Sequence, residues 1–222
     1  MKDERTYLRR QLRQSRRALT PRQQREASQR LLRQLAQHPL YRRSKHIAFY
    51  LANDGEINPD LLMQHARRLG KQCYLPVLSE WPANRMHFQR LVPDTHWITN
   101  RFGIREPMHD RKLQAKPWRL DLILMPLVGF DQNGNRLGMG GGFYDRTFAF
   151  RRQRLHWPGP RLLGLAHDCQ KVDQLPTAAW DIPLDGIVSD QQVILMPAAD
   201  SSRVQQNDQS SSGCSPLSPP QN

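Results

Sequence analysis

The segment from residue 46 to residue 78 constrains the fold most strongly. Residues 46–52 (HIAFYLA) and 73–78 (CYLPVL) are two apolar runs of strand length. Between them, Asn58 and Pro59 can begin a helix and Gly70 can end it, with apolar residues at helical spacing in between. A helix of about 12 residues between two strands predicts a βαβ unit, whose strands are parallel.

Three further buried-type runs follow at residues 120–125, 162–166 and 186–189, the last predicting a short final strand. The stretch between residues 79 and 119 is rich in tryptophan and proline and predicts little beyond a possible edge hairpin near residues 86–91. This alternation indicates an α/β fold, a three-layer α/β/α sandwich with a mainly parallel sheet.

The length of 222 residues fits one domain followed by a short tail. We predict a catalytic domain over residues 1–197 and a disordered tail, rich in Ser, Gln and Pro, over residues 198–222. No run approaches the ~20 apolar residues of a membrane-spanning helix, so we expect no membrane association. The first 20 residues are charged throughout and the three cysteines form no CxxC pair, so the cytoplasm is the expected location.

Positive charge is concentrated at the amino terminus. The net charge is +13, and residues 1–45 hold 14 Lys and Arg against 3 Asp and Glu. Leu8, Leu12 and Leu19 predict the apolar stripe of one helix, and Thr20-Pro21 predicts the start of a second. The arginines can form a solvated helix face, contact nucleic acid or attract a small polyanion such as a nucleotide. Because basic composition alone is a weak argument, nucleic-acid binding is not favoured as the main role.

The most informative segment is residues 127–146, LVGFDQNGNRLGMGGGFYDR, which follows a strand and precedes a possible helix. Glycines at such a place let backbone N–H groups approach phosphate oxygens closely, although a structural turn is the commoner explanation. The Walker A sequence is absent, and an EF-hand is excluded by Arg136 and Gly142 at its sixth and twelfth positions. What remains is a candidate phosphate-binding loop between Arg136 and Asp145. The carboxylate of Asp145 suits Mg²⁺ or the first turn of a helix.

Residues 126–146 are similar to the signature of the 5-formyltetrahydrofolate cyclo-ligase (methenyltetrahydrofolate synthetase) family. The resemblance extends from Arg5 to about Val188 and includes the DGEI sequence at 54–57 and WDIP at 180–183. It implies an ATP-dependent carbon–nitrogen cyclo-ligase, which converts 5-formyltetrahydrofolate and MgATP into 5,10-methenyltetrahydrofolate, ADP and phosphate. A binding module of the same fold, taking nucleotide or RNA without turnover, is the alternative.

The resemblance also implies the residues of the site. The implied ATP contacts are Arg5, Arg9, Arg136, Leu137, Gly138, Met139, Gly140, Gly141, Gly142, Phe143 and Tyr144. The implied folate contacts are Leu51, Glu56 and Phe143, the Mg²⁺ ligands are Asp145 and Asp181, and the catalytic residues are Arg136, Tyr144 and Asp145. The implied partner is a reduced folate, with or without a polyglutamate tail, bound to a monomer. Met139 and Gly141 depart from the Arg and Lys of some family members.

Overall fold

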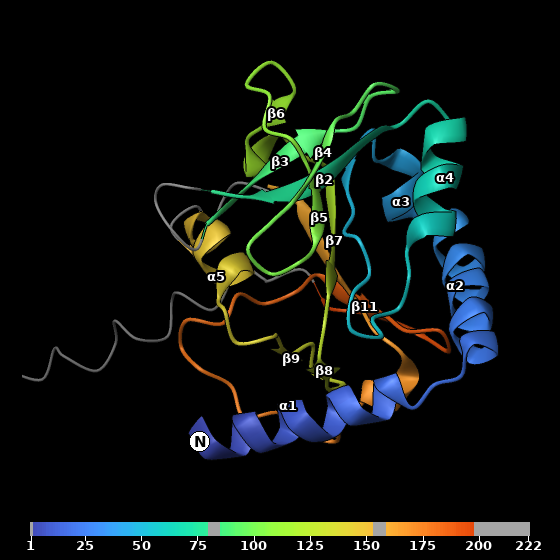
Figure 1. Ribbon diagram of the computed structural model, residues 1–222. Coiled ribbons are helices and arrows are strands. Elements are labelled where there is room, and N and C mark those ends of the chain that lie inside the picture. Colours follow the sequence, from blue (N-terminus) through green and yellow to red (C-terminus); the bar gives the residue numbers. More distant parts are fainter. Residues whose placement is uncertain (1, 80–84, 153–158, 198–222) are drawn as a thin grey trace, which may run out of the picture.

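A computed structural model describes residues 2–79, 85–152 and 159–197 of the chain, and Figure 1 shows their arrangement. An eight-stranded sheet has the order β12-β11-β10-β7-β1-β2-β3-β6. Its five central strands are parallel, and the pairings of β2 with β3, β3 with β6 and β11 with β12 are antiparallel. The strands are β1 (His46–Ala48), β2 (Gln72–Leu78), β3 (Met86–Arg90), β6 (Gln114–Ala115), β7 (Leu122–Pro126), β10 (Arg161–Leu165), β11 (Gly186–Val188) and β12 (Val193–Leu195).

The predicted βαβ unit is confirmed. Helix α4 (Asp60–Arg68) connects β1 to β2, which are parallel with His46 opposite Gln72. Strand β1 is shorter than the predicted run, because the chain leaves the ladder after Ala48 while Phe49 and Tyr50 stay buried in the core.

Two details of the predicted sheet are wrong. The segment near residues 86–91 forms β3, which pairs with β2 and is covered on its other side by β6, so it is not an edge. Strand β11 is not the last, since β12 pairs with it. Both differences follow from short strands, whose two or three residues leave little periodicity to read.

Helices and loops cover both faces of the sheet, so the predicted three-layer α/β/α arrangement is confirmed, with layers of unequal size (Figure 1). Helices α2 (Pro21–Ala36), α3 (Pro39–Arg43) and α4 cover one face, where Leu31, Leu35 and Tyr41 are fully buried. The other face packs on Phe88 and Phe148 beneath the short α5 (Phe143–Thr147) and the 3₁₀ turn η2 (Ala149–Arg152).

Smaller elements extend from this sheet. Two hairpins stand apart from the main ladder, and two more 3₁₀ turns lie in the connections. The hairpins are β4 (Trp97–Thr99) with β5 (Arg105–Pro107) and β8 (Gly129–Phe130) with β9 (Arg136–Leu137), and the turns are η1 (Pro117–Arg119) and η3 (Asp168–Gln170).

The first helix, α1 (Lys2–Arg17), lies beside β8 and η3, which follow the carboxyl ends of β7 and β10 (Figure 1). Leu12 is buried against Leu137, whereas Leu19 lies beyond the end of the helix, so the predicted stripe is wrong at Leu19. The helix ends at Arg17 because Thr20 caps α2 in a capping box with Gln23, which confirms the predicted start of the second helix.

The predicted disordered tail, residues 198–222, lies outside the described residues, so the domain boundary after residue 197 stays a prediction. Among the helices that the structure describes, none combines the length and the apolar character that a membrane crossing requires.

The core makes one stability prediction. Leu31 is fully buried in α2, so Leu31→Ala should lower the free energy of unfolding by about 3 kcal/mol through lost transfer energy and the cavity left behind. Urea denaturation measures the change. The matched control is Leu69→Ala, at a position 58% exposed, which should change stability by less than about 0.5 kcal/mol. Equal losses in the two variants would contradict the packing described here.

Candidate active site

A large cavity of about 780 Å³ opens at the carboxyl ends of the central strands. Leu51 follows β1, Leu78 ends β2 and Pro126 ends β7, and all three line the cavity. Strand β1 lies between β2 and β7 in the sheet. The chain therefore continues from β1 to its neighbour β2, and later adds β7 on the opposite side of β1, so the strand order reverses here. Ligands of open α/β sheets usually bind at such a point.

The glycine-rich segment forms one wall of this cavity. Gly140 and Gly142 have φ values of 99° and 64°, a region that disfavours residues with a side chain. The guanidinium of Arg9 donates from Nε to the carbonyl oxygen of Gly138 at 2.8 Å, which ties α1 to the loop. Helix α5 has only five residues, so its dipole adds little, and a bound anion would depend on the loop and the nearby cations.

Three predicted cations line the cavity, and two of them are paired with the predicted metal ligands. Arg5 donates to both carboxylate oxygens of Asp181, at 2.9 and 3.2 Å. Arg136, which is almost fully buried, donates to Asp145 Oδ1, which also accepts from the backbone of Ile182. These pairs join the amino-terminal helix and the glycine-rich segment to residues 181–182, between β10 and β11.

All the predicted site residues except Leu137 line this one cavity. Leu137 is fully buried beneath it, with Leu12 and Val128, so its side chain faces the core and not the cavity. The structure thus brings the others together, while the role of each one stays a prediction.

Sequence reasoning missed the hairpin β4–β5, whose Phe102, Arg105 and Glu106 also line the cavity. The ring of Phe102 meets that of Phe143 edge-on at 5.8 Å between centroids. The signal was a tight turn: Asn100 Oδ1 accepts from two backbone N–H groups, and Gly103 has a φ of 73°. An Asn and a Gly at that spacing indicate a turn between two short strands.

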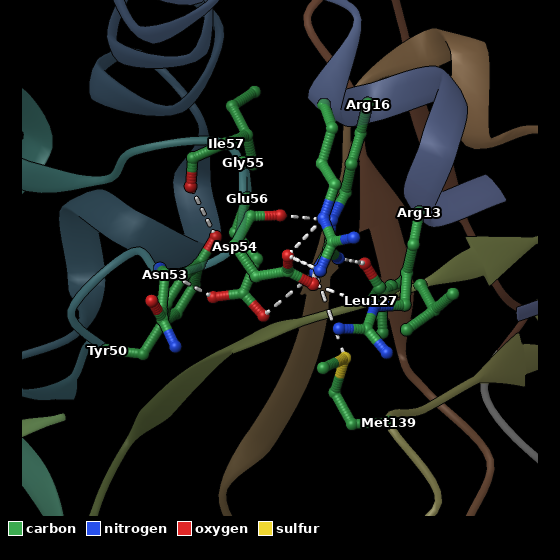
Figure 2. A network of polar contacts seen from close by, with 12 residues as sticks. Arg13, Arg16, Tyr50, Asn53, Asp54, Gly55, Glu56, Ile57, Leu127 and Met139 are labelled. Carbon is green, nitrogen blue, oxygen red and sulfur yellow. Dashed lines mark hydrogen bonds and ion pairs between the residues drawn. The ribbon is translucent and has the colours of Figure 1, made fainter. Parts of the chain in front are cut away.

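Glu56 is a buried acid of the cavity wall (Figure 2). Its side chain is 9% exposed, Oε2 accepts from the backbone of Asn53 at 3.1 Å, and Oε1 lies 3.9 Å from Arg16 Nη2. Burial raises the pKa of Glu56 to about 7, although the Asn53 hydrogen bond and the Arg16 charge both act to lower it. Glu56 can therefore accept or donate a hydrogen bond near neutral pH.

Two residues before it, Asp54 binds Arg13 and Arg16 of α1 (Figure 2). It also binds Arg17 of the same helix, and none of these three arginines was predicted as a site residue. Partial burial raises the pKa of Asp54, but hydrogen bonds from the three guanidinium groups outweigh it and leave that pKa below its usual value. Asp54 therefore stays charged and anchors the helix.

The pKa of Glu56 predicts a pH-dependent stability. The folded chain holds this proton up to about pH 7, whereas an unperturbed glutamate loses it near 4.5, so the free energy of unfolding falls as the pH rises between these values. At about pH 8, Glu56→Gln should be more stable than the parent by on the order of 2 kcal/mol. The gain should vanish at about pH 4, as followed by urea denaturation across the pH range.

The matched control for this titration is Glu26→Gln. Glu26 pairs with Arg22 on the surface of α2, which lowers its pKa, so any effect has the opposite sign. A stability gain of Glu56→Gln that is the same at both pH values would show that the site does not raise this pKa.

The fold and the cavity define the class, an α/β enzyme in which a cation-lined cavity lies beside a glycine-rich loop. A model of the 5-formyltetrahydrofolate cyclo-ligase family matches residues 1–190. The 5-formyltetrahydrofolate cyclo-ligase of Escherichia coli (strain K12) is 41% identical over 182 residues, which cover 82% of this chain and 98% of that protein. The enzyme of the same name from Haemophilus influenzae is also 41% identical, over 83% of this chain and 96% of its own length.

Solved structures agree with these relatives. The 5,10-methenyltetrahydrofolate synthetase of Aquifex aeolicus superposes with a TM-score of 0.73 at 28% identity, covering 92% of this chain and 98% of that one. A synthetase of the same name from Mycoplasma pneumoniae gives 0.64 at 25% identity, over 84% and 98%. The chain belongs to the 5-formyltetrahydrofolate cyclo-ligase family, which confirms the resemblance found in residues 126–146 and the class of ATP-dependent cyclo-ligases.

Proposed function

We propose that the protein converts 5-formyltetrahydrofolate and ATP into 5,10-methenyltetrahydrofolate, ADP and phosphate. The observation that carries this proposal is the composition of this cavity, which combines Arg5, Arg9 and Arg136 with a glycine-rich loop and with Glu56, whose side chain is 9% exposed. The cations and the loop suit a triphosphate, and an acid with a pKa near 7 suits the nitrogen and oxygen atoms of a folate ring.

The chemistry requires the formyl oxygen to become a good leaving group. That oxygen attacks the γ-phosphorus of ATP, the bond to the bridging oxygen breaks, and ADP leaves. The 10-nitrogen then attacks the formyl carbon and loses its proton, and cleavage of the carbon–oxygen bond releases phosphate and leaves the methenyl bridge. The protein mainly has to position the reactants and stabilise charge. We assign these tasks to Arg136, Tyr144 and Asp145, which are neighbours in the cavity wall.

We place the folate against Leu51, Glu56 and Phe143. Leu51 and Phe143 are partly buried apolar side chains of the cavity wall, and Phe143 offers a ring face without a hydroxyl group. Exposed Arg105 and Arg152 line the same cavity, which favours a reduced folate with one or more glutamates as the ligand.

Magnesium would be held by Asp145 and Asp181. Both carboxylates line the cavity, carboxylate oxygens are the ligands that Mg²⁺ prefers, and the ion takes its other ligands from phosphates and water. Arg136 and Ile182 both donate to Asp145 Oδ1, whereas Arg5 donates to both oxygens of Asp181, so Asp181 would have to release Arg5 to bind the ion. When bound, Mg²⁺ would neutralise charge that develops on the transferred phosphoryl group.

The contacts of α1 favour a small polyanion over nucleic acid as the partner. Arg5 and Arg9 line the cavity, and Arg13 and Arg16 bind Asp54 of its wall, so these four arginines do not form an open basic surface. We further expect a monomer in the cytoplasm whose catalytic unit is residues 1–197.

Turnover tests the proposed function directly. The absorption band of 5,10-methenyltetrahydrofolate should increase when the protein is mixed with both 5-formyltetrahydrofolate and ATP, and not when either is omitted. Removing Mg²⁺ with EDTA should suppress this increase. Binding of ATP without any growth of the band would favour the alternative, a nucleotide- or RNA-binding module, and full activity in EDTA would contradict the magnesium site.

Arg9 provides a more specific prediction. Arg9→Ala should raise the KM for ATP about tenfold, because it removes a charge from the cavity and releases Gly138 of the loop. Steady-state kinetics with varied ATP measure this. The control is Arg10→Ala, whose exposed side chain lies over Tyr7 on the same helix and should leave the KM unchanged. Equal values for the two variants would remove Arg9 from the nucleotide site.

A further inference from the structure

The turn that carries Glu56 has an unusual backbone. Asp54 has a φ of 53° and is the one non-glycine residue with a positive φ in the part of the chain that the structure describes, and Gly55 follows with 75°. A residue with a side chain persists in this region only where its surroundings hold it, and such positions cluster at functional sites. Contacts from neighbouring residues must therefore stabilise this turn.

Several side chains bind this turn, and among them Arg16 of α1 contacts both the backbone and the carboxylate of Asp54 (Figure 2). Its guanidinium is fully buried and donates from Nε to the carbonyl oxygen of Asp54 and from Nη2 to Asp54 Oδ2, both at 2.8 Å. Nη1 donates to the carbonyl oxygen of Leu127, just after β7, at 3.2 Å. One planar group thus fixes the strained turn to the helix and to the end of a central strand.

The same guanidinium lies between two sides of the cavity without lining it. Its Nη2 is 3.9 Å from Glu56 Oε1 and 3.8 Å from the sulfur of Met139 in the glycine-rich segment (Figure 2). Glu56 and Met139 both line the cavity, whereas Arg16 touches them from behind. This arrangement suits a residue that orients others and contacts no ligand itself.

We propose that Arg16 is a positioning residue for the cyclo-ligase reaction: it holds the Asn53–Glu56 turn so that the Glu56 carboxyl group faces the folate. The proposal rests on the proposed function, because that function makes Glu56 a folate contact. It assigns a role to a buried arginine that contacts neither ATP nor the folate directly.

The charge of Arg16, like its geometry, supports this role. Besides burial, the groups that shift the pKa of Glu56 are the Asn53 backbone N–H and Asp54 from its own turn and Arg16 and Arg13 from α1. Glu56 in turn raises the pKa of Tyr50 and Tyr144 in the cavity wall. Against the dominant effect of burial, Arg16 is the larger of the two cationic influences and lowers the pKa of Glu56. Removing its charge should therefore raise that pKa further, whereas replacing a residue whose charge does not act on Glu56 should leave it unchanged.

The test compares Arg16→Met with Arg17→Met. Arg17 also binds Asp54 from the same helix, but its side chain is 54% exposed and it is not among the charges acting on Glu56. In Arg16→Met, kcat/KM for 5-formyltetrahydrofolate should fall about tenfold or more, the KM for ATP should change less than twofold, and the Glu56 carboxyl should titrate at higher pH in ¹³C NMR spectra. Arg17→Met should match the parent in all three.

A second variant keeps the test decisive if Arg16→Met does not fold. Arg16→Lys retains the charge, but one ammonium group cannot reproduce the three separate nitrogens with which the guanidinium reaches the Asp54 carbonyl oxygen, the Asp54 carboxylate and Leu127. We therefore expect kcat/KM for the folate to fall while Glu56 titrates as in the parent. Parental kinetics in a folded Arg16→Lys, or identical titration and kinetics in Arg16→Met and Arg17→Met, would overturn the proposal. The NMR arm needs no turnover. A parent protein that lacks turnover would thus refute the function, while the titration still decides whether Arg16 acts on Glu56.

Discussion

Asp54 binds α1 through Arg13, Arg16 and Arg17, and the site depends above all on the contacts of the buried Arg16. Without a docked α1, Arg5 and Arg9 would not reach the cavity, since both are carried by the same helix. A buried guanidinium is costly unless its donors are satisfied, and Arg16 satisfies them with the backbone and side chain of Asp54 and with Leu127. The network therefore selects one orientation of the helix more than it adds general stability.

The turn at residues 53–56 carries two acids whose pKa values shift in opposite directions. Asp54 and Glu56 are two residues apart, yet three cations lower the pKa of the first while burial raises that of the second. One carboxylate remains charged and holds the structure, and the other exchanges its proton near neutrality beside the ligand site. Such divergence between neighbouring acids is a common way in which one site obtains two different groups from the same chemistry.

Local signals in the sequence predicted the parts of the structure that local interactions determine. The Thr20 cap, the β1–α4–β2 unit and the glycine-rich segment each depend on residues close together in the chain. The sequence did not predict which residues the arginines bind. Composition does not show whether an arginine faces solvent or an acid 41 residues away, as Arg13 faces Asp54. The hairpin β4–β5 was missed because Trp97–Thr99 is exposed on both faces and lacks an alternating pattern. Leu137 lies inside a glycine-rich motif, yet the pairing of β8 with β9 turns its side chain into the core.

The pairing of Arg5 with Asp181 spans 176 residues of the chain and has a consequence for biosynthesis. The helix that supplies the cations is synthesised before the residues that bind it, which stand at positions 54, 138 and 181. A chain whose translation stops early therefore contains the arginines of α1 but lacks part of the cavity wall that they contact. Long-range contacts of this kind form late, so ligand binding becomes possible only when almost all of the domain has been made.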